Sequence, residues 1–201
     1  MIININLGRD KFLETFICKM PKTEIVPCTR EEMDMLINST MEDDFFYMLF
    51  KVARKTGRRI GEYYDVRVKD IDFERKLMLT KVLKRRQKIE KEAILDDELT
   101  YLMKRYIQRE KLKLEDYMFR KVGYRQIQNK VSYFAKKAGI KHKVSFHNFR
   151  HFFVTELFKK GWTYDKIAKL TGHSSAGTLI SYDHTVASDI AEKAREDIKD
   201  L

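Results

Sequence analysis

The chain has 201 residues, 43% of them hydrophobic, which is enough for one domain with a core and excludes a chain that is disordered throughout. It carries 41 Lys and Arg against 30 Asp and Glu, and this net charge of +11 makes nucleic acid the leading expected partner, ahead of a basic surface that serves only solubility. The only cysteines, Cys18 and Cys28, form no CxxC pair, which argues against a zinc finger or a disulfide framework and favours a reducing cytoplasm.

Helix signals recur along the whole chain. They consist of capping side chains at the start, apolar residues at helical spacing, and glycine after the end. Residues 1–28 are expected to form a short leader with a small helix near 12–18. The helices predicted after the leader, in chain order, cover about 29–37, 43–54, 60–64, 96–108, 124–138, 145–161, 163–171 and 188–201. Ser145 is expected to cap the helix 145–161.

Between 66 and 95 the apolar period changes to that of strands. Leu77–Thr80 and Ala93–Leu95 are β-prone runs on either side of the polar stretch Lys84–Lys88. This pattern predicts a small antiparallel sheet with a basic hairpin tip. The expected fold class is therefore mainly α with a small antiparallel β-sheet, an α+β architecture. No apolar run is long enough to span a bilayer, and no membrane is expected as a partner.

The sequence His147-Asn-Phe-Arg150-His151 concentrates chemistry on one predicted helix. His147 and Arg150 are three residues apart, so they share a helix face. Phe146, Phe149 and Phe153 are expected to pack inward and hold that face rigid. Taken alone, this spacing of a histidine and an arginine is a weak signal, because it occurs by chance on many helices.

Other motifs flank this pair in a fixed order. Thr56-Gly-Arg-Arg59-Ile-Gly-Glu62 lies upstream, Thr171-Gly-His173 lies downstream, and Tyr182 follows His173 by nine residues. In this order and spacing the chain resembles the tyrosine recombinase family, which includes phage integrases and the Xer and Cre enzymes. The resemblance implies the fold of the catalytic domain and DNA strand cleavage and rejoining without a metal or other cofactor. One departure is Thr171, where the family usually has leucine.

The resemblance also implies roles for the arginines. Arg59 and Arg150 would clamp the scissile phosphate, because guanidinium groups stay charged and bind two oxygens at once. Arg58 competes with Arg59 for this role, but the register of the motif selects Arg59. Arg58 then falls at a usually apolar position, where it is expected to meet solvent or DNA. Glu62 is expected to support a neighbouring helix or basic side chain.

The remaining implied roles concern proton transfer and bond making. Tyr182 would be the nucleophile, with His147 as its general base, and His173 would bind the phosphate. His151 is expected to be structural, and His184 is given no catalytic role.

A lysine on the hairpin would act as the general acid for the leaving 5′ oxygen. Counting along the chain from Ile71 places it at Lys84, with Lys81 and Lys88 as alternatives because the predicted hairpin is long and rich in lysine.

The family's usual domain organisation gives expectations about the ends of the chain. Residues 29–201 correspond to the catalytic domain, and 1–28 to a remnant or linker of a missing N-terminal DNA-binding domain. The expected partners are double-stranded DNA and further copies in a tetrameric synapse, joined through the helix 188–201. Ile190, Ala194 and Ile198 would form its docking stripe, unless it packs back on its own domain.

Three other functions remain as alternatives. A catalytically inactive DNA-binding relative would keep the fold, although the complete residue set argues against it. A type IB topoisomerase uses nearly the same constellation. A metal hydrolase is disfavoured because no HExxH motif or carboxylate ligand accompanies the histidines it would need, which are His147, His151, His173 and His184.

Overall fold

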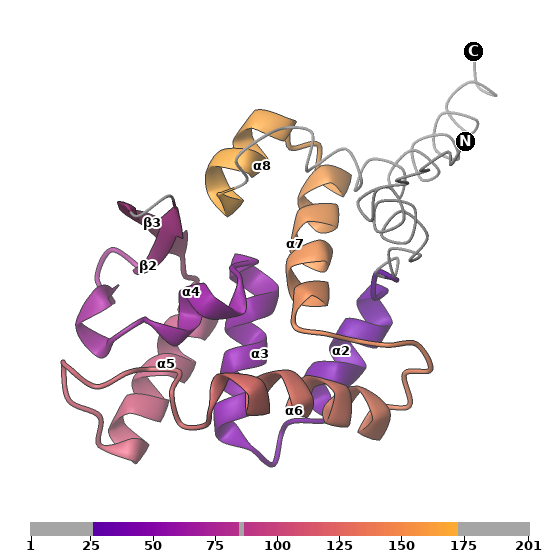
Figure 1. Ribbon diagram of the computed structural model, residues 1–201, viewed down its shortest axis with the longest axis horizontal. Coiled ribbons are helices and arrows are strands. Elements are labelled where there is room, and N and C mark those ends of the chain that lie inside the picture. Colours follow the sequence, from indigo (N-terminus) through magenta and orange to yellow (C-terminus); the bar gives the residue numbers. More distant parts are fainter. Residues whose placement is uncertain (1–25, 85–86, 173–201) are drawn as a thin grey trace, which may run out of the picture.

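The computed structural model describes residues 26–84 and 87–172 (Figure 1). Within them the protein is mainly helical with one small antiparallel sheet, so the predicted fold class is confirmed. The helices predicted near 12–18 and at 188–201, together with His173, Tyr182 and His184, lie outside the described residues. In the described part of the chain, no helix combines the length and apolar character needed to cross a bilayer.

Two capped helices, α2 and α3, come first in the described part of the chain. Helix α2 (Arg30–Asn38) begins at the predicted capping box, in which Thr29 and Glu32 bond each other's backbone N–H groups. Helix α3 (Asp44–Thr56) begins at Asp43 and ends at Gly57, whose φ of 59° is the left-handed conformation that glycine adopts without strain.

A short helix and the sheet follow at the end of α3. Helix α4 (Ile60–Tyr64) leads through the 3₁₀ turn η1 (Val68–Asp70) into β1 (Ile71–Asp72). Strands β2 (Leu77–Lys84) and β3 (Gln87–Ile94) then form an antiparallel hairpin, in the sheet order β1-β2-β3. Both strands continue through residues predicted to form the polar tip, because Lys84 pairs directly with Gln87.

The remaining described helices agree with the predicted bounds to within about two residues. They are α5 (Asp97–Glu110), capped by Asp96, α6 (Tyr124–Lys137), α7 (His147–Lys159) and α8 (Tyr164–Thr171). Figure 1 shows α3 in the middle of the molecule, with α7 and α8 on one side and α6 across its base.

The predicted cap of α7 is wrong. The helix begins at His147, and its N-cap residue Phe146 makes no side-chain capping bond within the described structure. The hydroxyl of Ser145 instead donates to Oδ1 of Asn148, which also accepts the backbone N–H of Ser145 at 2.9 Å. The side-chain amide of Asn148 therefore holds the residue before the helix. Because the hydroxyl of Ser145 donates to Asn148, it does not cap the helix as predicted.

Aromatic side chains join α3 to the helices around it. Phe50 on α3 packs against Phe149 on α7, with ring centroids 4.9 Å apart, and Phe46 packs against Phe134 on α6 at 5.3 Å. Phe149 is fully buried, as predicted, but Phe153 is only half-buried. The core thus fixes α7 against α3, and the site is built along this seam.

Candidate active site

A cavity of about 430 Å³ opens between the loop after α3 and the start of α7, beside α6. Among the described residues that line it, Arg58, Arg59, Lys143 and Arg150 are cationic, His147 contributes an imidazole, and none is acidic. A cavity with this lining attracts an anion. The structure thus brings together Arg59, His147 and Arg150, which the sequence analysis selected from two separate motifs.

Arg150 is the most firmly held of the three. Its side chain is 1% exposed, and Nη1 donates a 3.0 Å hydrogen bond to the carbonyl oxygen of Gly57. That carbonyl lies at the C-terminal end of α3, where the helix dipole is negative and stabilises a cation. The bond directly connects the Thr56-Gly motif with α7.

Gly57 itself leaves no room for a side chain. A Cβ at this position would lie 2.8 Å from Cγ of Phe153 and 2.9 Å from its Cβ. Glycine is therefore required both by its positive φ and by the close approach of α7. The tight packing of α3 on α7 sets the position of Arg150 relative to Arg59.

Arg59 lies at the N-cap of α4, and its side chain is 43% exposed. The carboxylate of Glu62, which is buried, accepts two hydrogen bonds from Arg59. One comes from Nη1 at 3.2 Å and the other from the backbone N–H of Arg59 at 3.3 Å. Glu62 supports a basic side chain, as the sequence analysis expected. Its contacts orient the guanidinium of Arg59 while leaving part of it open to the cavity.

The expectation that Arg58 meets solvent or DNA on an open surface is wrong. Its side chain is 1% exposed, and Nη2 donates to the carbonyl oxygen of Glu92 on β3. Among the described residues, Nε and Nη1 have no hydrogen-bond partner. Burial lowers the pKa of this guanidinium. The long aliphatic stem of arginine can occupy an apolar position, and Arg58 is also among the residues that line the cavity.

The two histidines on α7 contact each other. The rings of His147, which lines the cavity, and of His151, which is half-buried, have centroids 5.1 Å apart and planes at 69°. Desolvation lowers the pKa of His147, and the charges of Arg150 and Arg59 lower it further. Desolvation, followed by His147 and Arg150, lowers the pKa of His151 to about 4. Both imidazoles are therefore neutral at pH 7, and a neutral imidazole can accept a proton.

The hairpin lysines differ in what the structure describes of them. Lys81 forms an ion pair of 3.0 Å with Asp70, which is buried. Lys84 ends β2 and Lys88 lies on β3, and only their strand positions are described. Lys91, which the sequence analysis did not consider, packs its side chain against Gly172, the residue before His173. This contact brings β3 beside the end of α8.

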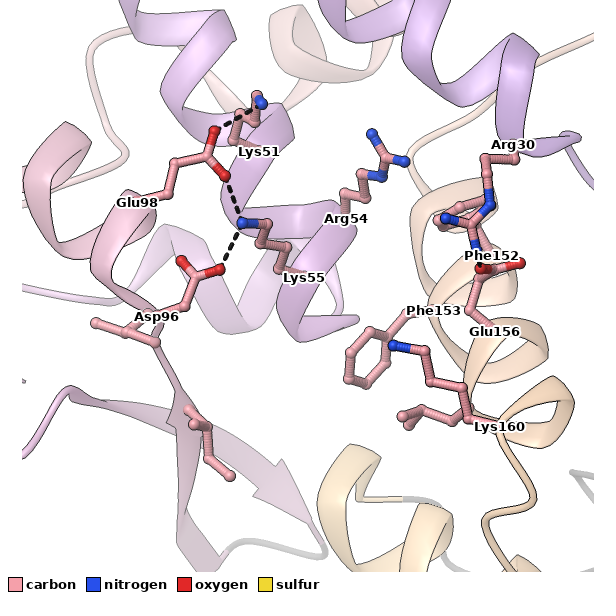
Figure 2. A pocket seen from close by; sticks show the side chains of 13 residues that line it. Arg30, Lys51, Arg54, Lys55, Asp96, Glu98, Phe152, Phe153, Glu156 and Lys160 are labelled. Carbon is pink, nitrogen blue, oxygen red and sulfur yellow. Dashed lines mark hydrogen bonds and ion pairs between the residues drawn. The ribbon is translucent and has the colours of Figure 1, made fainter.

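A second hollow, of about 550 Å³, lies between α3, α7 and the start of α5 (Figure 2). Three of its cations, Arg30, Lys51 and Lys55, are paired with carboxylates of the lining itself. Lys55 lies between Asp96 and Glu98, and Arg30 lies against Glu156. The three carboxylates of the lining offset part of the charge of its five cations, so the excess of positive charge is smaller here than among the described residues that line the cavity beside α6.

Comparison with known proteins adds independent findings. The model of the Phage integrase family matches residues 19–188. Tyrosine recombinase XerA of Saccharolobus solfataricus is 31% identical over 143 residues, covering 71% of this chain and 47% of the relative. XerA of Pyrococcus furiosus is 26% identical over 185 residues, covering 87% and 62%. The chain therefore spans between about half and just under two thirds of the length of these curated relatives.

Solved structures agree with the sequence relatives. The crystal structure of XerA recombinase superimposes with a TM-score of 0.74 and 25% identity, covering 85% of this chain and 65% of the other. XerH site-specific recombinase, in a post-cleavage complex with a palindromic difH substrate, gives 0.70 with 20% identity, covering 84% and 52%. At this identity, the second likeness supports the fold alone.

Proposed function

The chain belongs to the phage integrase family of tyrosine recombinases, and from this premise we propose that it cuts and rejoins DNA in site-specific recombination through a 3′-phosphotyrosyl intermediate. The observation that carries the proposal is the convergence of Arg59, His147 and Arg150 on one cavity whose described lining has no carboxylate. Cys- or Ser-based hydrolysis would need a different set of groups beside the nucleophile.

The arginines answer the main electrostatic demand of the reaction. Attack on a phosphodiester builds negative charge on the non-bridging oxygens, and preorganised donors stabilise it without reorganising. Arg150 is prepositioned by Gly57 and Arg59 by Glu62. Together they would hold the two non-bridging oxygens, with Arg58 adding a third positive charge at the cavity wall.

Proton transfer would be divided between the two sides of the phosphate. Tyr182 is the proposed nucleophile, and neutral His147 would accept its phenolic proton as the Oη–phosphorus bond forms. The bond from phosphorus to the 5′ oxygen breaks, and Lys84 would donate the proton that this oxygen takes up. His173 would bind the phosphate.

Rejoining is the reverse reaction. A 5′ hydroxyl attacks the phosphotyrosine and returns its proton to Lys84, while the bond from phosphorus to Tyr182 breaks and the phenol recovers its proton from His147. The number of phosphodiester bonds is therefore conserved. The scheme needs no ATP and no metal ion, and residues 29–201 would supply all its groups.

The proposed partners are double-stranded DNA and further copies of the chain. The net charge of +11 favours a polyanion, and relatives of similar fold, such as XerH and the Tn1549 integrase, are described in complex with DNA. A tetrameric synapse would join through residues 188–201. Residues 1–28 would be the linker or remnant of an N-terminal DNA-binding domain. The proposed place of action is the cytoplasm.

The experiment that tests this function traps the covalent intermediate. A pool of duplexes with randomised sequence and a nick near the centre loses a short fragment when cleavage occurs, so the protein stays attached to the strand. We expect a denaturation-resistant adduct with the wild-type chain, formed also in excess EDTA, and none with Tyr182→Phe. DNA binding without any adduct would favour the inactive DNA-binding relative instead, and sequencing the attached strands would reveal the target.

A further inference from the structure

A cluster of three potential metal ligands lies at the start of α2, outside the cavity described above. Cys28 precedes the helix, Glu32 lies in its first turn, and His142 lies in the loop between α6 and α7. One ligand atom from each of these side chains lies within 4.8 Å of the other two. No sequence motif connects these three residues, and the sequence predicts no metal site that includes them.

The distances are close to those around a bound ion. Nε2 of His142 lies 3.1 Å from Oε2 of Glu32. Ligand atoms around tetrahedral zinc are separated by roughly 3.2–3.8 Å, given bond lengths of about 2.0–2.3 Å. Closing the separations that involve Cys28, which are at most 4.8 Å, to this range would place all three ligand atoms around one ion.

Neighbouring groups orient the ligands. The backbone N–H of Thr29 donates to Glu32 in the capping box at 2.9 Å, which fixes the carboxylate. Nδ1 of His142 lies 3.4 Å from the carbonyl oxygen of Lys143, so a proton on Nδ1 leaves the Nε2 lone pair for a metal. Asn148 donates to the carbonyl oxygen of Val26 at 2.7 Å, which holds the segment before the helix.

We propose that Cys28, Glu32 and His142 bind a divalent transition-metal ion, of the class of Zn²⁺, which fastens the start of α2 to the loop that leads into α7. Thiolate, imidazole and carboxylate are together the ligand set of zinc and of its spectroscopic substitute Co²⁺, whereas Mg²⁺ and Ca²⁺ select oxygen ligands. A water molecule would complete a four-coordinate shell.

The electrostatics of the cluster favour a cation. An ion that binds displaces the thiol proton to solvent and then faces one thiolate and one carboxylate, whose two negative charges balance its own. Cys28 is 6% exposed, but the side chains of His142 and Glu32 are 21% and 25% exposed, so the ion can enter from solvent.

The expected effect is structural. The loop containing His142 connects α6 to α7, and α7 carries His147 five residues further along. An ion that binds the folded chain and not the unfolded one stabilises the fold by mass action. The proposal does not depend on the proposed DNA chemistry, because none of its ligands lines the catalytic cavity.

The test uses the full chain, freed of metal, and titrates it with Co²⁺. A Co²⁺–thiolate bond produces an intense charge-transfer absorption in the near ultraviolet, which histidines alone cannot give. We expect this band to saturate at one equivalent and to disappear when Zn²⁺ is added. The melting temperature should rise with Zn²⁺ under the same conditions.

Three variants make the assignment specific. Cys28→Ser should abolish the band, whereas Cys18→Ser, the matched control at the only other cysteine, should keep it. His142→Gln should weaken Co²⁺ binding by at least about 10-fold, since even changes next to a ligand cost this much. Circular dichroism in the absence of metal checks that each variant folds. A wild-type chain without the band, or a band that survives Cys28→Ser, would overturn the proposal.

Discussion

Nη1 of Arg150 donates a hydrogen bond to the backbone carbonyl oxygen of Gly57, 93 residues earlier in the chain, at 3.0 Å. This bond joins the two arginine motifs at the point where α3 ends. The proposed phosphate clamp therefore depends on backbone geometry at Gly57 as much as on the arginine side chains.

The first prediction concerns Arg150 itself. Arg150→Lys keeps the charge but loses the planar guanidinium, which can donate to the carbonyl oxygen of Gly57 and to a phosphate at the same time. We expect the rate of adduct formation to fall by about 10²–10³-fold, the usual loss for one preorganised donor at a developing charge. The measurement is single-turnover cleavage of the trapped substrate, with Arg105→Lys on α5 as a control. Equal rates for the two variants would remove Arg150 from the clamp.

The second prediction tests the packing at Gly57. Gly57→Ala places a methyl group against Phe153 and forces alanine into a left-handed φ, so we expect a loss of about 1–3 kcal/mol in the free energy of unfolding. The matched control is Gly61→Ala in α4, where no described heavy atom lies within 4 Å of the new Cβ. That change should leave stability equal or raise it by up to about 1 kcal/mol. Urea unfolding of both variants gives the comparison, and equal stabilities would contradict the account.

The third prediction separates two roles for Arg58. Arg58→Met fills the same buried space without a charged group of which Nε and Nη1 lack hydrogen-bond partners among the described residues, so stability should stay within about 1 kcal/mol of wild type or increase. If the guanidinium adds charge to the phosphate site, adduct formation should slow by about 10-fold, and Arg58→Lys should recover part of that loss. A large loss of stability with an unchanged cleavage rate would make Arg58 purely structural.

The fourth prediction is a pH dependence of stability. The pKa of His151 is about 4 in the folded chain and 6.5 ordinarily, so the unfolded chain binds more protons between these values. The contribution of His151 is present above pH 6.5 and is lost as the pH falls towards about 4. Urea midpoints measured from pH 7.5 to 4.5 should decline less steeply in His151→Gln than in wild type. Parallel curves would show that His151 does not titrate in this way.

The fifth prediction distinguishes the hairpin lysines. Lys84→Ala should slow cleavage of ordinary DNA, while a substrate with a 5′-thio leaving group, which needs no proton, should restore the rate. Lys81→Ala removes the partner of buried Asp70 and should lower stability, with no such rescue. Rescue in Lys81→Ala or Lys88→Ala, and none in Lys84→Ala, would transfer the acid role accordingly.

Local signals predicted most of the fold. The Thr29–Glu32 capping box and the glycine at position 57 mark helix ends through contacts within a few residues, and the structure has them where the sequence predicts. The face shared by His147 and Arg150 follows directly from helical periodicity. The resemblance to a family then selected Arg59 over Arg58, and because both residues line the cavity, that choice stays a prediction.

Other features depend on contacts that no local pattern contains. Arg58 is buried against β3, where its guanidinium bonds the carbonyl oxygen of Glu92. The residues of the α3–α4 turn alone do not predict this contact. The hydroxyl of Ser145 is taken by Asn148, an equally good capping residue in competition with it. Cys28 and His142 are more than one hundred residues apart in sequence, and only the tertiary structure brings them together.

The lining of the cavity also bears on how such a protein could be redirected. Guanidinium and imidazole groups recognise a phosphate, and the backbone phosphate is chemically the same between any two nucleotides. Discrimination between targets then falls to side chains outside the cavity, on surfaces that face the bases or follow the shape of the duplex. A chain built in this way could be selected for a new target while Gly57, Arg59 and Arg150 remain unchanged.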